Sequence, residues 1–330
     1  MTMVRRSRRR IPAAVKNAAN PRFMAPRLWK LLAGSEFAAA EAAVRRARLV
    51  AEKPDHRWTF HYQFDGPLPS VIGKVYGDPG HGRRSYATMC WLAEHGVAVP
   101  RPLGWVEELA MLAYLHVPGR MLGEQLFRSG AAVDMEQAAA WLFSLHRSAL
   151  PLDRTFDVPH EIENIQAWAA VVAEAYPDHA WAADQIAERL ADRAREMGTV
   201  SDRPIHKDFH HEHVFVGDRV HVIDLDEVRF GDPAYDLAHF CAYLRLQGCR
   251  FPAMASTLER RRLEFLDAYE RLSGSTASAA YPVFFAYTCL KIAKQLCTSR
   301  GLVPRPEVRE EHRQTAEILR EGLLALGAGA

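Results

Sequence analysis

Apolar residues gather into short strand-like runs, divided by polar turns, near the start of the chain. The runs cover residues 47–52, 58–64 and 70–76, and the turns between them are rich in proline, aspartate and glycine. We expect these runs to form an antiparallel meander. Ahead of them, apolar residues at helical spacing after Ser35 predict a helix from residue 36 to about residue 46.

The next elements extend this β-rich portion to Pro118-Gly119-Arg120. A helix from about residue 83 to residue 95 is stopped by Gly96, and residues 103–106 and 110–116 have the pattern of a hairpin. The predicted order in this portion is therefore helix, three strands, helix and two strands.

Later in the chain the apolar spacing is mainly helical, with one β-like interruption. Residues 214–216 and 220–223 flank a Gly-Asp turn, which predicts a tight hairpin inside a helical portion. After the hairpin, Ser256 and Glu259 have the spacing of a capping box, and Gly274 is placed to end the same helix.

These patterns divide the chain into three parts and predict an α+β fold. We expect a flexible basic arm over residues 1–34, a β-rich portion over residues 35–117 and a helical portion over residues 118–330. The arm precedes any apolar periodicity, and it contains a run of arginines: Arg5, Arg6, Arg8, Arg9 and Arg10.

The composition is that of a water-soluble globular protein, with 330 residues, 48% hydrophobic and 25% charged side chains. The formal net charge of +2 is nearly balanced, so we expect no binding to nucleic acid. No apolar run approaches the ~18 residues of a membrane span, and the basic arm lacks the apolar stretch of a secretory signal. We therefore expect no membrane association.

The five cysteines are odd in number, widely spaced and never arranged as a CxxC pair. This spacing argues against a disulfide framework and against a cysteine-rich zinc site. We expect reduced cysteines in the core and a cytoplasmic location.

The predicted hairpin carries the residues with the most chemical information. Asp208 lies before the hairpin, and Asp224 follows its second strand. Because a hairpin returns its second strand beside its first, these aspartates should converge. Converging carboxylates suit phosphoryl transfer, in which the protein supplies positioning and charge neutralisation. Asp208 would orient the acceptor hydroxyl and receive its proton, Asp224 would hold Mg²⁺, and Asp226 would ligate the ion through water.

The motifs His206-x-Asp208, Ile223-Asp224 and Gly231-Asp232-Pro233 followed by Asp236 occur in an order that resembles aminoglycoside phosphotransferases and choline kinases. The resemblance implies a two-lobed, protein-kinase-like fold with a small antiparallel-sheet N-lobe and a larger, mostly helical C-lobe. It also implies that Asp208 is the catalytic base, that Asp224 binds metal, and that His206 and Asp236 support the catalytic loop. The implied cofactors are ATP and Mg²⁺, and the implied acceptor is a hydroxyl of a small polar molecule, such as an aminoglycoside-like antibiotic, a sugar or an amino alcohol.

A lone lysine, Lys74, occupies the otherwise apolar run at residues 71–76. An unpaired ammonium group is costly to bury, so Lys74 needs an anionic partner. The resemblance implies that this lysine pairs with the α- and β-phosphates of ATP. It also places the nucleotide hinge near Tyr114, Leu115 and His116.

Three features depart from the resembled family. His213 stands where the family usually has an asparagine that binds a second Mg²⁺, and imidazole is a poorer ligand for this hard cation. Residues 53–57 contain no glycine to bring backbone amides close to phosphate, so Lys53 or Arg57 would supply charge instead. The helix after Lys74 lacks the usual glutamate partner. These departures support a second hypothesis, a nucleotide-binding pseudokinase or regulatory protein of the same fold.

The density of histidines supports a third hypothesis, a transition-metal cluster in a hydrolase. Its candidate ligands are His206, His210, His211 and His213, with His221 nearby. Their spacing contains no HxxxH or HExxH helix, so we favour the kinase interpretation.

Overall fold

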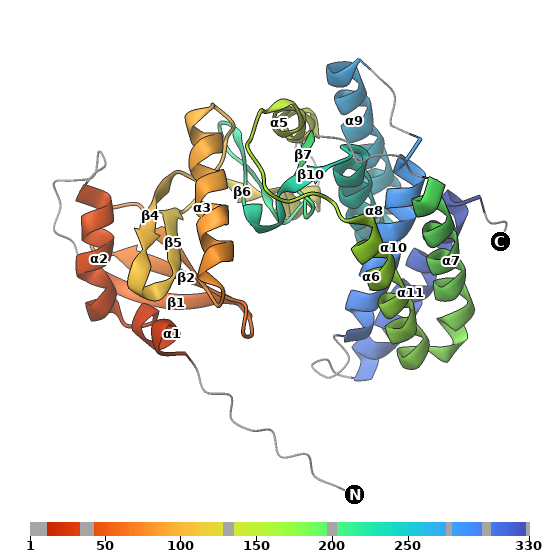
Figure 1. Ribbon diagram of the computed structural model, residues 1–330, viewed down its shortest axis with the longest axis horizontal. Helices are drawn as coiled ribbons and strands as arrows, with labels where there is room; N and C mark the ends of the chain where they lie inside the picture. Colours follow the sequence, from red (N-terminus) through yellow and green to blue (C-terminus); the bar gives the residue numbers. More distant parts are fainter. Residues whose placement is uncertain are drawn as a thin grey trace, which may run out of the picture. The chain divides into compact units, whose positions relative to one another are not determined.

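The computed structural model of the protein describes residues 12–33, 43–127, 135–196, 203–274, 279–298 and 305–327. The chain divides into two compact units, Met1–Pro118 and Gly119–Ala330, which can be followed by colour in Figure 1. The first unit is built on an antiparallel sheet and the second is mostly helical, which confirms the predicted α+β class. Among the described residues, no helix is both long and apolar enough to cross a membrane.

Five strands form the sheet of the first unit, in the spatial order β1-β2-β3-β5-β4. In that order their bounds are Val44–Lys53, Arg57–Phe64, Val71–Tyr76, Met111–Leu115 and Pro102–Val106. The predicted meander and hairpin are therefore confirmed. The helix expected up to residue 46 is wrong at its end, because Val44 already pairs with Phe64 in the sheet. Residues 34–42 lie outside the described part of the chain.

The two faces of this sheet are covered by different helices (Figure 1). The helices are α1 (Ala13–Ala18), α2 (Pro21–Ala33) and α3 (Pro79–Glu94). Phe60 and Tyr62 point to the face packed by α1 and α2, where the Tyr62 hydroxyl donates to the Ala18 carbonyl at 2.9 Å. Because side chains alternate along a strand, Lys74 of β3 points to the opposite face, which α3 covers.

The structure differs from the flexible arm expected over residues 1–34, because much of this segment is helical. The Asn20 side chain accepts hydrogen bonds from the backbone N–H groups of Arg22 at 3.0 Å and Phe23 at 3.4 Å, and so caps α2. Three residues at helical spacing are buried against the sheet: Met24, Leu28 and Leu32. The arginine run of residues 5–10 lies before residue 12, outside the described residues.

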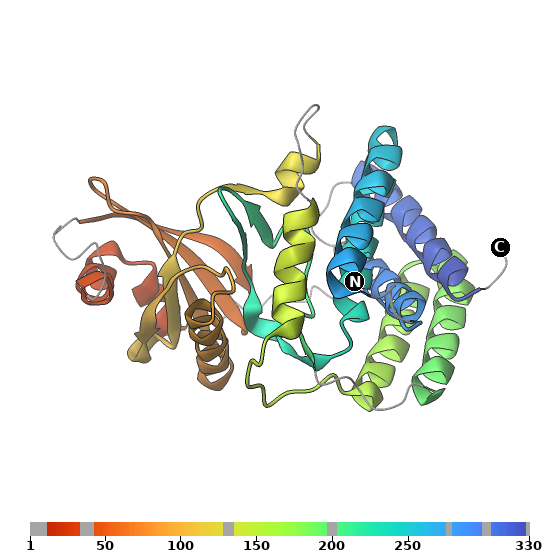
Figure 2. The same cartoon turned by 90° about the horizontal axis from the view of Figure 1, so that it is seen from above.

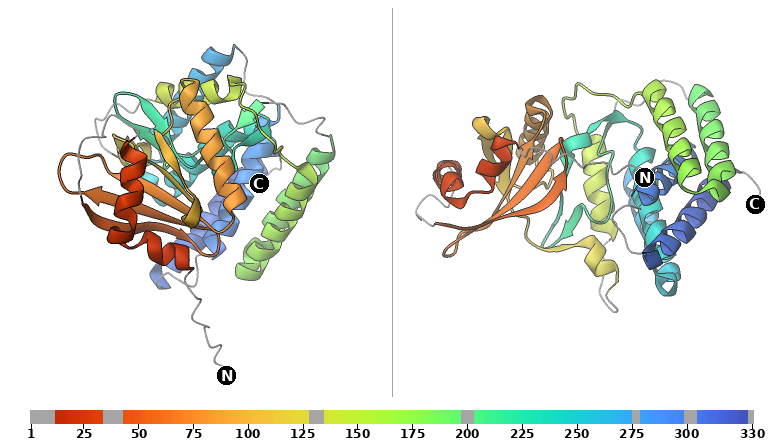
Figure 3. Two further views of the ribbon diagram at one scale, coloured as in Figure 1. Left: turned by 60° about the vertical axis from the view of Figure 1, so that its left-hand side comes forward. Right: turned by 90° about the horizontal axis from the view of Figure 1, so that it is seen from below.

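Helices build most of the second unit. They are α4 (Leu122–Leu126), α5 (Met135–Arg147), α6 (Val158–Ala175), α7 (Ala180–Glu196), α8 (Ala234–Arg250), α9 (Ala255–Ser273), α10 (Tyr281–Thr298) and α11 (Arg305–Ala325). α6 and α7 lie side by side, and α10 packs against α6, α8 and α11 (Figure 2 and Figure 3). Most residues of α8 and α10 are buried, so these two helices form the centre of the unit.

Two small sheets lie among these helices. One contains β6 (Arg120–Met121), β8 (Val214–Val216) and β9 (Val220–Val222), and the other contains β7 (Arg203–Ile205) and β10 (Arg229–Gly231). In the predicted hairpin, now confirmed, Val214 lies opposite Val222 and Val216 lies opposite Val220. This pairing fixes the positions of the segments that precede β8 and follow β9.

The start of α9 differs from the expected capping box at Ser256. The helix begins two residues earlier than a cap at Ser256 would place it. Its N-cap residue Met254 makes no side-chain cap hydrogen bond, and Glu259 pairs with Arg262 one turn on. The expected end is confirmed, because Gly274 adopts the left-handed conformation with φ of 70° that commonly ends helices.

Substitution of Leu28 by alanine tests whether α2 is an integral part of the first unit. Leu28 is fully buried, so Leu28→Ala should lower the free energy of unfolding by about 2–5 kcal/mol, through lost apolar contacts and the cavity left behind. Denaturant titration followed by circular dichroism measures the change. Lys30→Ala on the exposed side of the same helix is the control and should change stability by less than about 0.5 kcal/mol. Equal stability of the two variants would contradict the packing described for α2.

Candidate functional site

A loop of residues 206–213, here called the His-rich loop, connects β7 to β8. After β8 and β9, Asp224 follows the hairpin in the left-handed conformation with φ of 62°. The backbone N–H of Ile223 donates to the His213 carbonyl at 3.0 Å. The hairpin therefore holds the end of the His-rich loop directly against the residue that precedes Asp224.

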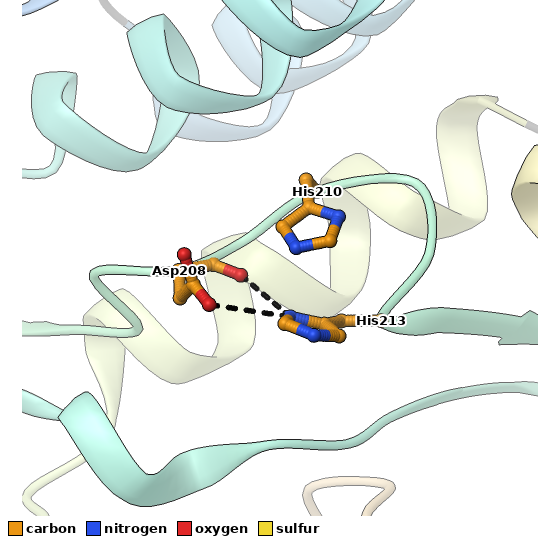
Figure 4. A group of neighbouring side chains, drawn as sticks. All are labelled: Asp208, His210 and His213. Carbon is orange, nitrogen blue, oxygen red and sulfur yellow. Dashed lines mark hydrogen bonds and ion pairs between the residues drawn. The ribbon is translucent and has the colours of Figure 1, made fainter. Parts of the chain in front are cut away.

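His213 lies between the two aspartates. Its Nδ1 atom is 2.8 Å from the Asp208 carbonyl oxygen and 3.9 Å from Asp208 Oδ2, as the dashed lines in Figure 4 show. Its Nε2 atom is 3.6 Å from Asp224 Oδ2. The structure thus brings three predicted site residues together, with the imidazole of His213 in contact distance of both aspartates.

The hydrogen bonds of His213 decide which of its atoms can bind a cation. Only a protonated Nδ1 can donate to the Asp208 carbonyl, so in the neutral ring Nε2 keeps its lone pair. That lone pair lies on the side of Asp224, whose side chain is only 14% exposed. One imidazole nitrogen and one carboxylate oxygen are therefore placed to bind a divalent cation. A nitrogen ligand favours cations of intermediate softness over hard cations such as Mg²⁺.

Asp236, at the start of α8, holds the beginning of the His-rich loop. Its Oδ2 accepts the backbone N–H of His206 at 2.6 Å, and its Oδ1 accepts that of Lys207 at 2.8 Å. His146 Nε2 lies 3.1 Å from Oδ2, and His146 Nδ1 lies 2.7 Å from the Tyr269 hydroxyl. Burial raises the pKa of Asp236, but His146 and His206 lower the pKa by more, so the carboxylate is ionised.

His206 links the same loop to the hairpin. Its Nδ1 accepts the backbone N–H of Asp208 at 3.3 Å, so its Nε2 carries the proton that it donates to the Ile223 carbonyl at 3.0 Å. The ring is fully buried, and burial lowers the pKa of His206. His206 and Asp236 together fix the backbone on both sides of Lys207, which has a left-handed φ of 64°.

Asp208 faces two groups that sequence reasoning missed. Lys291 Nζ of α10 donates to Asp208 Oδ1 at 3.4 Å, and His239 Nε2 of α8 lies 3.3 Å from the same oxygen. Burial raises the pKa of Asp208, but Lys291 and then His239 lower the pKa by more, and it falls well below its usual value. Burial also lowers the pKa of His239 to about 4, so the positive charge at this oxygen belongs to Lys291.

Lys207 is held by a second buried network. Its Nζ forms an ion pair with Glu161 of α6, and the Tyr287 hydroxyl of α10 donates to the other oxygen of the same carboxylate. Asn164 Nδ2 adds a hydrogen bond to that oxygen at 3.2 Å. Burial raises the pKa of Glu161, but Lys207 and these hydrogen bonds lower the pKa by more. The network joins α6 and α10 to the residue next to Asp208.

Among the described residues, Asp208, His210 and His213 form a group whose ligand atoms lie within 4.8 Å of one another (Figure 4). His206, His211 and His221 are not in this group, so the broad histidine cluster considered from the sequence reduces to two histidines. His210 Nδ1 accepts the backbone N–H of Glu212 at 3.3 Å, and its ring stacks on Tyr243 at 4.7 Å. These contacts show that His210 has packing and hydrogen-bonding roles of its own.

Asp226, the remaining predicted metal ligand, lies in the short 3₁₀ turn Leu225–Glu227. The residue is 5% exposed, and its carbonyl accepts a hydrogen bond from Arg154 Nη2 at 2.6 Å. This bond fixes the backbone of the turn that follows Asp224.

The predicted nucleotide-binding residues lie in the first unit. Lys74 is 5% exposed at the centre of β3, and Lys53 pairs with Arg57 across the β1–β2 turn. Tyr114 is buried in β5, and His116 stacks on another histidine, His61, at 5.0 Å.

The backbone of the expected hinge makes hydrogen bonds inside the first unit. The N–H of Leu115 donates to the Arg101 carbonyl at 3.0 Å, and the N–H of His116 donates to the Ser70 carbonyl at 2.9 Å. These two N–H groups therefore hold the hinge segment to its neighbouring strands. Sequence reasoning placed the segment but did not identify these partners.

A model of the phosphotransferase enzyme family matches residues 78–280, which is more than half of the chain. The match includes the His-rich loop, the hairpin, Asp224 and α8. A search of the curated proteins finds no match.

Solved structures of similar fold are distant in sequence. A protein of Ralstonia eutropha JMP134 assigned as an aminoglycoside phosphotransferase is 16% identical with a TM-score of 0.61, over 86% of this chain and 94% of that one. Spectinomycin phosphotransferase in complex with ADP and spectinomycin is 14% identical with a TM-score of 0.59, over 91% and 98%. Choline kinase LicA from Streptococcus pneumoniae is 14% identical with a TM-score of 0.59, over 93% and 99%. These likenesses show a shared fold, and together with the family match they establish that the chain belongs to the phosphotransferase enzyme family.

Proposed function

We propose that the protein transfers the γ-phosphoryl group of ATP to a hydroxyl group of a small polar molecule, in a reaction that depends on Mg²⁺. The observation that carries this proposal is the position of His213, which contacts Asp208 on one side and Asp224 on the other. This arrangement keeps a carboxylate for the acceptor hydroxyl next to a carboxylate for the cation, as phosphoryl transfer requires.

Asp208 has the properties of the group that orients the acceptor. Its carboxylate is ionised and 30% exposed, so it can accept a hydrogen bond from an incoming hydroxyl. The acceptor oxygen then forms a bond to the γ-phosphorus while the bond from that phosphorus to the β–γ bridging oxygen breaks. ADP leaves with the electron pair of the broken bond, and the hydroxyl proton passes to Asp208.

Asp224 and His213 Nε2 would hold Mg²⁺, and Asp226 would contribute through water. When bound, the cation offsets the negative charge of the nucleotide phosphates. Asp236 and His206 keep the loop backbone fixed, so Asp208 needs no rearrangement when the acceptor arrives.

In the first unit we propose that Lys74 binds the phosphates of ATP, with Lys53 or Arg57 adding charge, and that Tyr114 and His116 lie at the nucleotide base. The position of Lys74 supports this role, because it matches the lysine with which the resembled family binds the nucleotide phosphates, and its side chain points away from the sheet face packed by α1 and α2. The ADP in spectinomycin phosphotransferase supports nucleotide binding by this fold.

We also propose a cytoplasmic location and no membrane or nucleic-acid partner. The support is that all five cysteines are unpaired and that four of them are buried in the core.

One observation favours a second candidate, a nucleotide-binding pseudokinase or regulatory protein. His213 replaces the amide that the resembled family uses as a metal ligand, and nitrogen is less suited than oxygen to Mg²⁺. A thermal-shift titration with ATP and Mg²⁺, combined with assays of transfer to a library of hydroxyl acceptors, separates the two. Stabilisation by the nucleotide without transfer to any acceptor would favour the pseudokinase.

Asp208→Asn tests the proposed transfer. The amide keeps the size of the side chain but removes the proton acceptor, so turnover should fall by about 100- to 10,000-fold. Coupled measurement of ADP release gives the rate, and isothermal titration calorimetry with ADP and Mg²⁺ should show binding within about twofold of the wild type.

Asp224→Asn is the matched control for this experiment, because it removes the other carboxylate beside His213. It should weaken the binding of ADP in the presence of Mg²⁺ as well as turnover. Wild-type turnover by Asp208→Asn would refute the assignment of Asp208.

His213→Asn tests the preference for the cation. An amide oxygen in place of the imidazole nitrogen should lower the Mg²⁺ concentration for half-maximal turnover by about tenfold and reduce any activity with Co²⁺ relative to Mg²⁺. Titration of each metal at saturating ATP measures both effects. His221→Asn, in the hairpin but outside the group of close ligand atoms, is the control and should leave the ratio of Co²⁺ to Mg²⁺ activity unchanged. An unchanged metal preference in His213→Asn would show that His213 does not ligate the cation.

A further inference from the structure

Three carboxylates in and near the His-rich loop are paired with basic side chains. Glu161 pairs with Lys207, and Asp208 itself pairs with Lys291. Beyond β9, Glu227 pairs with Arg229. These three ion pairs mean that the three carboxylates carry compensated charge, so each is a weak partner for an additional cation.

Lys291 is a charged group in direct contact with Asp208, the proposed base. Its Nζ lies 3.4 Å from Asp208 Oδ1, and its side chain is 21% exposed, which is open enough to meet a bound molecule. The other neighbour of the same oxygen is His239, which is fully buried and neutral. The charge at Oδ1 is therefore that of one lysine, placed by α10.

The acceptor must come close to this lysine. Its reacting hydroxyl has to reach the Asp208 carboxylate within about 2.6–3.2 Å to donate a hydrogen bond. When that hydroxyl bonds Oδ1, the substituents on its neighbouring carbon atoms come within reach of Lys291 Nζ, which lies beside the same oxygen. Because Asp208 and Lys291 compensate each other, a substituent on the Nζ side of the pair meets the lysine before the carboxylate. There an ammonium substituent is repelled, a neutral hydroxyl is tolerated, and a carboxylate or phosphate is attracted.

We propose that Lys291 determines acceptor specificity, selecting molecules whose reacting hydroxyl is flanked by neutral or anionic groups over molecules with an ammonium group there. The proposal rests on the phosphotransferase function proposed above. It narrows the acceptor class to polyols, sugars and their acidic derivatives, and it disfavours amino alcohols and amino sugars.

Three sugars of similar size and different charge test this selectivity on the full-length protein. Glucose, glucuronate and glucosamine present neutral, anionic and cationic forms of one hydroxyl-bearing ring. With ATP labelled at the γ-phosphate, we expect kcat/KM for glucose or glucuronate to exceed that for glucosamine by at least about tenfold.

Variants of Lys291 assign the selectivity to its charge. Lys291→Gln should reduce the discrimination against glucosamine, Lys291→Glu should reverse it, and Lys291→Arg should restore it. Lys294→Glu is the control, because it makes the same charge change on the same helix three residues away, and it should keep the wild-type order. Circular dichroism and ADP binding confirm that each variant is folded.

Two kinds of failure can be told apart. The role of Lys291 is overturned if the wild type prefers glucosamine, or if the wild type, Lys291→Gln and Lys291→Glu rank the three sugars in the same order. The phosphotransferase proposal stands in both cases, because transfer has been observed. Transfer to none of the sugars would count against that broader proposal. In that case the role of Lys291 is tested by calorimetry, which measures the binding of the three sugars to the protein saturated with ADP and Mg²⁺. The role is overturned if no sugar binds, if all three bind equally, or if glucosamine binds most tightly.

Discussion

The site depends on one buried carboxylate, that of Asp236, accepting two successive backbone N–H groups. The hydrogen bonds inside the His-rich loop leave the backbone N–H groups of His206 and Lys207 to be bonded from outside, at the point where the chain turns through a left-handed residue. The hydrogen bonds of Asp236 to His206 and Lys207 select one conformation. An isolated buried carboxylate would be costly, but these two N–H groups and His146 compensate its charge. The direction in which Asp208 points follows from this anchor, since Asp208 is the next residue along the loop.

The same loop explains why histidine is compatible with this site. His213 uses one nitrogen to bond the Asp208 carbonyl and presents the other to Asp224, so it supports the loop and faces the cation position with a single ring. An asparagine can also bond a carbonyl and present an oxygen, but it is shorter. The imidazole therefore preserves the connection between the two aspartates. In the metal site that we propose, it would exchange an oxygen ligand for nitrogen, a change that affects the preferred cation more than the architecture.

The sequence was informative where the structure is local. The hairpin between residues 214 and 223 could be predicted because turn chemistry and apolar runs are adjacent in the chain, and the hairpin in turn predicts that the segments of Asp208 and Asp224 converge. Lys291 and His239 could not be found this way, because helix packing brings them to Asp208 from 83 and 31 residues further along the chain. The one available signal for Lys291 was a lysine within an otherwise apolar helical run.

The helices α1 and α2 were missed for a different reason. The arginine run before them suggested an unstructured segment, although Asn20 and the spacing of Met24, Leu28 and Leu32 together contain a helix start and an apolar face. At Ser256 the sequence pattern instead predicted a capping box that does not form, because Glu259 binds Arg262. A charged residue has several candidate ion-pair and hydrogen-bond partners in a sequence, and the three-dimensional structure determines which of them it contacts.

The networks around Asp208 also connect the proposed recognition of the acceptor to the proposed catalysis. α10 supplies Lys291 to the carboxylate of Asp208 and Tyr287 to Glu161, which in turn holds Lys207. A shift of α10 would therefore alter the charge beside Asp208 and the support of its neighbour at the same time. In the proposed reaction the acceptor approaches the exposed side of Asp208, so the helix that carries Lys291 also contacts the proposed base. Selectivity in such a site need not come from a separate binding pocket, since an acceptor that disturbs the Lys291–Asp208 pair would also misplace the group that we propose accepts its proton.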